Sequence, residues 1–181
     1  MPIPRLTEEG ILPNSIYECS LEELENVFGR FQSTDCRIHL TRKLRAYIDE
    51  LRKSGMGTEL IIDGSYVTRK DDPGDIDLIL VLAEDFDYSS PINPFEYNLA
   101  SNKVVKRKYG FDVFVEKKGT GRYNSRIEFF QRVKENPDLT KGLLKILRRA
   151  LVRRHSYHFL SLRLVRNPSG FFRKILAPAS R

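Results

Sequence analysis

Two helices are predicted in the first third of the chain by the spacing of hydrophobic residues and by the signals at the helix ends. Ser20 and Glu23 form a capping box, in which each side chain accepts a hydrogen bond from a backbone N–H of the first turn. We expect that helix to end near residue 30. A longer helix is expected from Thr34 or Asp35 to residue 54, because hydrophobic residues recur there at roughly helical spacing. These residues are Ile38, Leu44, Ile48 and Leu51.

Three shorter segments have the pattern of buried strands. Residues 58–63 form an apolar run that ends at a Gly-Ser turn, and residues 111–116 alternate in the manner of a strand, with Asp112 and Phe114 on one face. The segment 75–82 is the clearest strand, since it becomes apolar on both faces after an acidic start. This pattern is typical of a central strand that carries functional residues at its N-terminal end.

The remaining segments complete the predicted fold. Asn93-Pro94 is a cap followed by proline in the first turn, which predicts a helix over 94–106, and another helix is expected over 124–135. Residues 1–18 are expected to form an irregular arm. The segment from Gly142 fits either a strand or the start of a basic helix that runs to Arg154.

These elements predict an α/β fold, or α+β by a stricter definition, with a small mixed β-sheet flanked by helices. Because no repeat, low-complexity tract or Gly/Ser linker divides the chain, we expect one domain over 1–147 and a C-terminal extension over 148–181. No stretch has the roughly 18 uncharged apolar residues of a membrane helix, and the N-terminus lacks a signal-peptide layout. We therefore expect a soluble, cytoplasmic protein without a membrane partner, whose two cysteines, Cys19 and Cys36, are reduced.

Charge is unevenly placed along the 181 residues, whose formal net charge is +7. No acidic residue follows Asp138, whereas eleven Lys and Arg do, so residues 1–138 alone have a net charge of −4. The basic extension therefore has the charge of a nucleic-acid-binding segment or of one that binds an acidic partner. A merely solvated extension is the other interpretation.

Three carboxylates have the positions expected of metal ligands. Asp75 and Asp77 are two residues apart at the start of a predicted strand, so their side chains are expected on the same face. Asp112 opens another predicted strand and can bring a third carboxylate to the same surface. Carboxylate oxygens suit Mg²⁺, which also retains waters and substrate phosphates in its coordination shell. Two such ions activate an attacking oxygen and stabilise a leaving group in phosphoryl chemistry.

A turn that can hold phosphates precedes these carboxylates. Gly64 allows close approach of the backbone to a phosphate, and Ser65 supplies a hydroxyl and a backbone N–H at the start of a short helix. Thr68, Arg69 and Lys70 follow within reach of the same anion. Carboxylates that face a phosphate-binding turn are the minimum equipment for phosphoryl or nucleotidyl transfer. The other interpretation of Arg69 and Lys70 is that they belong to a surface loop beside acidic neighbours.

The order Gly-Ser, about ten residues, Asp-x-Asp and a later acidic residue resembles the signature of polymerase-β-like nucleotidyltransferases. The run from Ile62 to Leu78 looks like a small, largely uncharacterised bacterial subgroup of that superfamily. Gly10-Ile-Leu-Pro-Asn, Phe129-Phe130-Gln and Lys141-Gly142 are further places of similarity, and the resemblance spans roughly 5–147. Where many minimal members read Gly-Ser-x-Ala-Arg-Gly, this chain reads Gly-Ser-Tyr-Val-Thr-Arg.

The resemblance implies a nucleotidyltransferase domain that uses a nucleoside triphosphate with Mg²⁺ or Mn²⁺. Gly64 and Ser65 would hold the β- and γ-phosphates, Asp75 and Asp77 would bind the metals, and Asp112 would complete that site and help to activate an acceptor hydroxyl. Small members of the superfamily often act beside toxin–antitoxin or phage-defence genes, and some modify proteins or transfer RNA. The expected acceptor is therefore a protein or an RNA.

Three other functions stay open at this point. The chain can be a catalytically silent regulator, such as an antitoxin, or a nucleic-acid-binding module in which the basic extension dominates. It can also hydrolyse or otherwise process a nucleotide. The chain is too short for the helical domain with which larger superfamily members hold the base and the acceptor.

Overall fold

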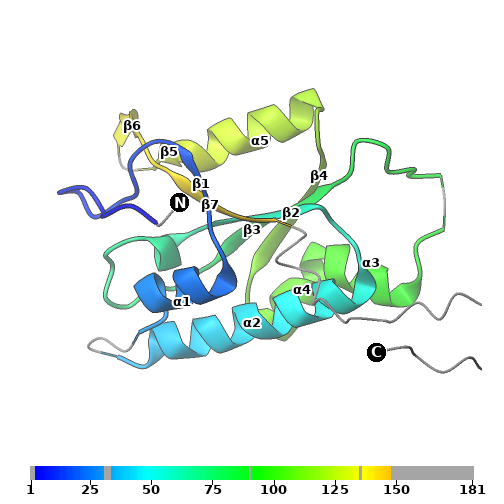
Figure 1. Cartoon of the computed structure of the whole chain (residues 1–181), viewed down its shortest axis with the longest axis horizontal. Helices are drawn as coiled ribbons and strands as arrows, with labels where there is room; N and C mark the ends of the chain where they lie inside the picture. Colours follow the sequence, from blue (N-terminus) through cyan, green and yellow to red (C-terminus); the bar gives the residue numbers. More distant parts are fainter. Residues whose placement is uncertain (1–2, 31–33, 90, 135, 148–181) are drawn as a thin grey trace, which may run out of the picture.

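A five-stranded mixed sheet forms the centre of the protein in the computed structural model, which describes residues 3–30, 34–89, 91–134 and 136–147. The strands lie in the order β1-β7-β2-β3-β4, so the last strand is inserted between the first two (Figure 1). β1 with β7 and β3 with β4 are parallel pairs, whereas β2 is antiparallel to both β7 and β3. The strands are β1 (Ile16–Glu18), β2 (Glu59–Asp63), β3 (Asp77–Leu82), β4 (Asp112–Lys117) and β7 (Leu143–Leu147).

Helices cover the two faces of this sheet unequally. α1, α2, α3 and α4 lie on one face of the sheet and α5 lies on the other, as Figure 1 shows. A short 3-10 helix, η1 (Ser65–Val67), and a two-stranded sheet of β5 (Arg132–Val133) and β6 (Asn136–Thr140) complete the fold. The helices are α1 (Leu21–Phe28), α2 (Cys36–Ser54), α3 (Pro94–Ala100), α4 (Asn102–Tyr109) and α5 (Gly121–Gln131). The expected mixed α/β fold with a small mixed sheet is confirmed at this level.

Alternate residues of the central strands enter two separate cores. On β2, Ile62 joins the large cluster under α1 to α4, whereas its neighbour Ile61 joins a small cluster under α5. Leu78 and Ile79 divide in the same way on β3. Both faces of the sheet are therefore buried along most of its length, which explains why these strands read as continuous apolar runs.

The predicted helices are present, and two of them differ in extent from expectation. The capping box at Ser20 forms as predicted. The helix expected over 94–106 is two helices, α3 and α4, because Ser101 has an extended backbone with ψ 111°. The helix expected over 124–135 begins at Gly121, after Thr120 caps it through the N–H of Tyr123, and it ends at Gln131.

The predictions for the strands and for the N-terminal arm need two corrections, and one open alternative is decided. β3 begins at Asp77 and not at Asp75, so Asp75 belongs to the segment that leads into the strand. The arm expected over 1–18 contains β1, which forms because β7 offers it a parallel partner. The segment from Leu143 to Leu147 is a strand, whereas the alternative helix to Arg154 and the extension 148–181 lie outside the described residues.

Two further expectations concern the whole chain. Cys19, which is buried, and Cys36, which is partly buried, are both free thiols. Among the described helices, none has both the length and the apolar character that crossing a membrane requires.

Candidate active site

Three aspartates lie side by side across neighbouring strands at one edge of the sheet. Asp63 at the end of β2 is paired with Asp77 at the start of β3, and Asp77 is paired with Asp112 at the start of β4. Residues in direct register on adjacent strands point to the same face, with Cβ atoms roughly 5 Å apart. This carboxylate row lies on the face of α5, because its members alternate with the residues of the large core.

Asp75 joins the row from the segment before β3 and is held by Ser65. The Ser65 backbone N–H donates to Asp75 Oδ1 at 2.9 Å, and the Ser65 hydroxyl donates to the same oxygen. The Ser65 hydroxyl in turn accepts from the backbone N–H of Gly74 at 3.0 Å. Burial opposes the ionisation of Asp75, but the hydrogen bonds from Ser65 outweigh it and lower the pKa of Asp75. The Gly-Ser turn therefore stabilises a charged carboxylate next to Asp77.

Gly64 makes this contact possible. Its φ is +96°, a region that favours glycine, and a Cβ at this position would lie 2.9 Å from the Asp75 carbonyl oxygen and 3.0 Å from the Asp77 nitrogen. Gly64 therefore packs closely against the backbone of residues 75–77. That packing brings Ser65 against Asp75.

Asp77 is repelled by two other carboxylates, those of Asp75 and Asp112. Burial is the largest cause that raises the pKa of Asp77, and the negative charges of Asp75 and Asp112 raise it further. The positive charges of Lys134 and Lys141 act in the opposite direction. Asp77 therefore lies where negative potential converges, which is where a bound cation gains the most.

Asp63 is the buried end of the row and forms an ion pair with Lys141. Lys141 Nζ donates to both Asp63 carboxylate oxygens at 2.8 Å, and only 6% of the Asp63 side chain is exposed. Burial raises the pKa of Asp63 to about 6, although Lys141 and the N–H of Gly64 act to lower it. Asp63 therefore keeps Lys141 beside the row and has a structural role.

Asp112 is the exposed end of the row, and two side chains of α4 bond to its carboxylate. Lys106 Nζ donates to its two oxygens at 3.0 and 2.7 Å, and the Asn102 amide donates to Oδ1 at 3.3 Å. Asn102 also accepts from the backbone N–H of Val113 at 2.8 Å, which ties the start of α4 to β4. The Lys106 side chain is 60% exposed, so it can leave Asp112 without uncovering the core.

The chemistry of the row suits a divalent cation. Within the described residues, no group of three or more His, Cys, Asp and Glu side chains is arranged to hold a metal ion. In this arrangement Asp75 faces Ser65 and Asp112 faces Lys106. The donors are nevertheless carboxylate oxygens, which Mg²⁺ and Mn²⁺ prefer, and the repulsion at Asp77 is of the kind that a cation relieves. Asp75, Asp77 and Asp112 are the residues that could hold it.

The loop after Ser65 is positioned by a buried arginine that the sequence analysis did not single out. Arg37 on α2 is 1% exposed, and its guanidinium donates to four carbonyl oxygens. Those oxygens belong to Phe28, Tyr66, Thr68 and Lys70, at distances of 3.1, 2.7, 2.8 and 2.5 Å. The sequence did contain a signal for Arg37. Arg37 precedes Leu40 by three residues, so helical spacing places it on the buried side of α2.

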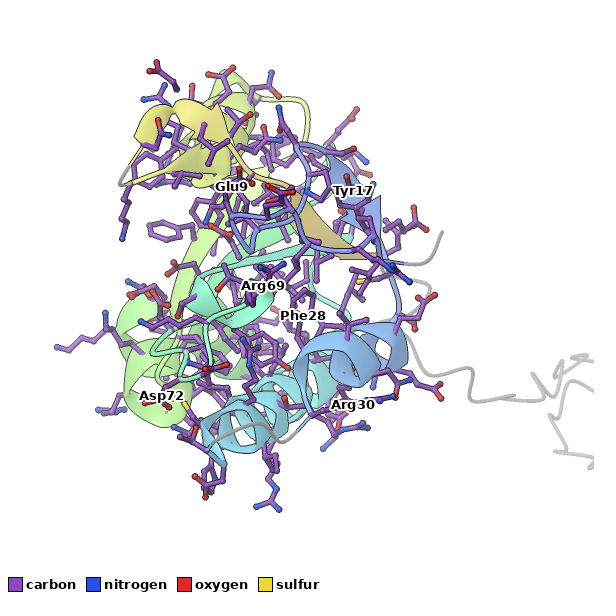
Figure 2. The ribbon with its side chains drawn as sticks, turned by 90° about the vertical axis from the view of Figure 1, so that its left-hand side faces the viewer. Glu9, Tyr17, Phe28, Arg30, Arg69 and Asp72 are labelled. Carbon is purple, nitrogen blue, oxygen red and sulfur yellow. The ribbon has the colours of Figure 1, made fainter. Side chains whose placement is uncertain are left out.

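The three phosphate candidates of this loop have different surroundings. The Thr68 hydroxyl donates to the Ser65 carbonyl at 2.7 Å and accepts from the Lys70 N–H, so it shapes the loop. Arg69 donates to the carbonyls of Thr7 and Glu8 and so binds the N-terminal arm; Figure 2 shows it from the end of the sheet where this loop lies. Lys70 is exposed, and its charge helps to lower the pKa of Asp75. Lys70 is therefore the best placed of the three to meet a ligand.

Three sequence segments that are far apart in the chain meet beside the row. Lys141 donates its backbone N–H to the Gln131 carbonyl at 2.8 Å, and the Gln131 amide donates to Asn14 at 3.0 Å. Gly142 packs so closely that a Cβ would lie 2.2 Å from the Pro13 carbonyl oxygen. Residues 12–14, Gln131 and residues 141–142 thus form one junction, from which Lys141 reaches Asp63.

Residues 4–147 match a family that is described as a family of unknown function, DUF6932. Because this match covers more than half of the chain, the protein belongs to that family. No curated protein and no solved structure matches the chain.

Proposed function

We propose that this protein is a metal-dependent nucleotidyltransferase of the polymerase-β-like kind, which moves a nucleoside monophosphate from a nucleoside triphosphate to an acceptor. The position of Asp77 carries the proposal. It is in register with Asp112 on the neighbouring strand and two residues from Asp75, whose carboxylate accepts from the Gly-Ser turn. Three converging carboxylates beside such a turn are the set that this chemistry requires.

In the proposed reaction, an oxygen of an acceptor hydroxyl forms a bond to the α-phosphorus of the triphosphate. The bond between that phosphorus and the oxygen bridging to the β-phosphate breaks, and pyrophosphate leaves. The hydroxyl proton passes to Asp112. Mg²⁺ or Mn²⁺ bound by Asp75, Asp77 and Asp112 would supply Lewis acidity that neutralises phosphate charge and lowers the pKa of the hydroxyl.

The other residues of the site have supporting parts in this proposal. Ser65 keeps Asp75 ionised and oriented, and Gly64 permits the packing that brings the two together. Gly64, Ser65 and Lys70 lie on the side of Asp75 where the triphosphate would be bound, and Thr68 holds their loop in shape. For Asp112 to receive the proton, Lys106 must release it, which the exposure of Lys106 allows.

The test is transfer of label from each of the four α-³²P-labelled nucleoside triphosphates with Mg²⁺ or Mn²⁺, using total RNA and a cell lysate as acceptors. We expect Asp77→Asn to lower transfer at least about a hundredfold and EDTA to abolish it. Asp85→Asn is the matched control, because Asp85 is an exposed aspartate in the loop after β3. Equal transfer by Asp77→Asn and wild type would sink the proposal.

A catalytically silent binding protein, such as an antitoxin-like regulator, is the second candidate. The observation that favours it is the pairing of both Asp112 oxygens with Lys106. A silent protein keeps these contacts when nucleotide and Mg²⁺ are added. Absence of label transfer under every condition, with unchanged Lys106 and Asp112 NMR signals, would favour this candidate.

A further inference from the structure

A pocket lies at the edge strand β4, next to α5 and away from the carboxylate row. Its volume is about 430 Å³, within the range of pockets that bind small molecules. We call it the α5 pocket. It is lined by Glu116, Gly121, Arg122, Ser125, Arg126 and Phe129.

The helical side of the α5 pocket combines positive charge with an exposed aromatic ring. Arg122, Arg126 and Phe129 are at positions i, i+4 and i+7 of α5, so they lie on one side of the helix. The Arg122 side chain is 83% exposed and Phe129 is 57% exposed. Two guanidinium groups beside an accessible phenyl ring form a surface that binds phosphates and stacks on a planar group.

Glu116 forms the base of the α5 pocket and holds the two arginines in place. Only 4% of its side chain is exposed; its oxygens lie 3.3 Å from Arg126 Nε and 3.6 Å from Arg122 Nε. Arg126 also lies over the ring of Phe114, 4.2 Å from the centroid. One carboxylate cannot neutralise two guanidinium groups, so the α5 pocket retains a positive charge.

The α5 pocket is on the same face of the same strand as the exposed end of the carboxylate row. Asp112, Phe114 and Glu116 alternate along β4 and therefore point to one face. Four residues of strand separate Asp112 from Glu116, which is a distance of about 13 Å at a rise of about 3.3 Å per residue. An extended ligand in the α5 pocket can therefore reach Asp112 along β4.

We propose that the α5 pocket binds the acceptor of the transfer reaction and that this acceptor is a single-stranded RNA. One base stacks on Phe129, Arg122 and Arg126 bind the flanking phosphates, and the strand runs along β4 to present a hydroxyl to Asp112. The proposal rests on the proposed function for the role of Asp112. RNA is favoured over an acidic protein segment, because acidic side chains would pair with the arginines but leave the exposed ring unused.

The test measures binding of a fluorescein-labelled, single-stranded oligoribonucleotide of mixed sequence to the full chain. Binding is monitored by fluorescence anisotropy at several salt concentrations. We expect Phe129→Ala to weaken binding about tenfold through loss of stacking. We expect Arg122→Gln to reduce the slope of log K against log salt by about 0.7, the value for one phosphate contact of a single strand. Matched controls are Tyr97→Ala, an exposed aromatic on α3, and Arg107→Gln, an exposed arginine on α4.

Each outcome decides a separate point. Variants that bind RNA as their controls do would overturn the α5 pocket as the RNA site. Labelled polyglutamate is measured in the same assay as a second probe. Variants that lose binding to polyglutamate but still bind RNA would make the ligand an acidic protein segment. Full label transfer to RNA by Phe129→Ala would exclude the α5 pocket as the acceptor site. Asp77→Asn separates the two proposals, since it should lose transfer and keep RNA binding. If the wild-type protein transfers no label but Phe129→Ala binds RNA more weakly than its control, the RNA site is supported and only the proposed enzyme activity is refuted.

Discussion

The two faces of the central sheet are made by the same strands, but they carry different residues where β3 and β4 begin. At the edge where β3 and β4 begin, Ile76 and Phe111 are fully buried in the large core under the four helices. The residues that directly follow them, Asp77 and Asp112, are only partly buried on the face of α5. One face is therefore apolar to its end, whereas the other changes from apolar to acidic.

This difference shows how adjacent carboxylates that repel one another are kept together. Burial of apolar surface on the four-helix face fixes the register of β2, β3 and β4. That register places Asp63, Asp77 and Asp112 side by side, whatever their mutual repulsion costs. The heavily covered face thus stabilises an arrangement whose chemistry lies on the lightly covered face.

The largest expected effect tests the connection between the four-helix face and the Gly-Ser loop. Arg37→Met removes four hydrogen bonds to carbonyl oxygens and leaves those oxygens without this donor. We expect the free energy of unfolding to fall by about 3 to 5 kcal/mol, as measured by urea denaturation. Arg42→Met, at an exposed position of the same helix, should change it by less than about 0.5 kcal/mol. Equal stability of the two variants would contradict the role given to Arg37.

A pair of substitutions on one strand compares the two faces directly. Ile61 and Ile62 are both 0% exposed, and they point to opposite faces of β2. We expect Ile62→Ala to cost about 4 kcal/mol and Ile61→Ala about 2 kcal/mol, both within the usual range for such cavities. The smaller cost follows because α5 is a single helix that can move to fill the space. The same loss of unfolding free energy in both variants would show that the faces are equally well packed.

The smallest effect is a pH dependence that belongs to the row itself. Because burial raises the pKa of Asp63 from 3.8 to about 6, the folded state binds this proton more tightly than the unfolded state. The contribution of Asp63 to stability is therefore fully present below pH 4 and is lost as the pH rises through 6. A ¹³C-NMR titration of the Asp63 carboxyl should have its midpoint near pH 6. A midpoint at or below pH 4 would contradict this.

Much of the fold was predictable from the sequence because its signals are local. The capping box at Ser20 and the double-sided apolar pattern of β3 each lie within a few residues and identify their elements. The break at Ser101 had no glycine or proline to mark it, and β1 forms only because a strand more than 120 residues later pairs with it. Elements of that kind depend on tertiary contacts.

The candidate site divides in the same way. The sequence predicted Asp75, Asp77 and Asp112 as neighbours from their places at the starts of strands, and β3 and β4 do pair with Asp77 and Asp112 in register. The lysines that hold the ends of the row could not be predicted. Lys141 is 78 residues from Asp63, and Lys106 reaches Asp112 only because α4 packs against β4.

The insertion of β7 between β1 and β2 has a consequence for how the protein is synthesised. Among the described strands, β1 pairs with β7 alone, and β2 has a neighbour on its second side only when β7 is present. Lys141, the partner of Asp63, lies two residues before that strand. While the chain grows, the sheet and the carboxylate row must therefore wait for residues 141–147, and such late, long-range pairing is intrinsically slow. A product released before residue 147 would expose the edges of β1 and β2 to other chains.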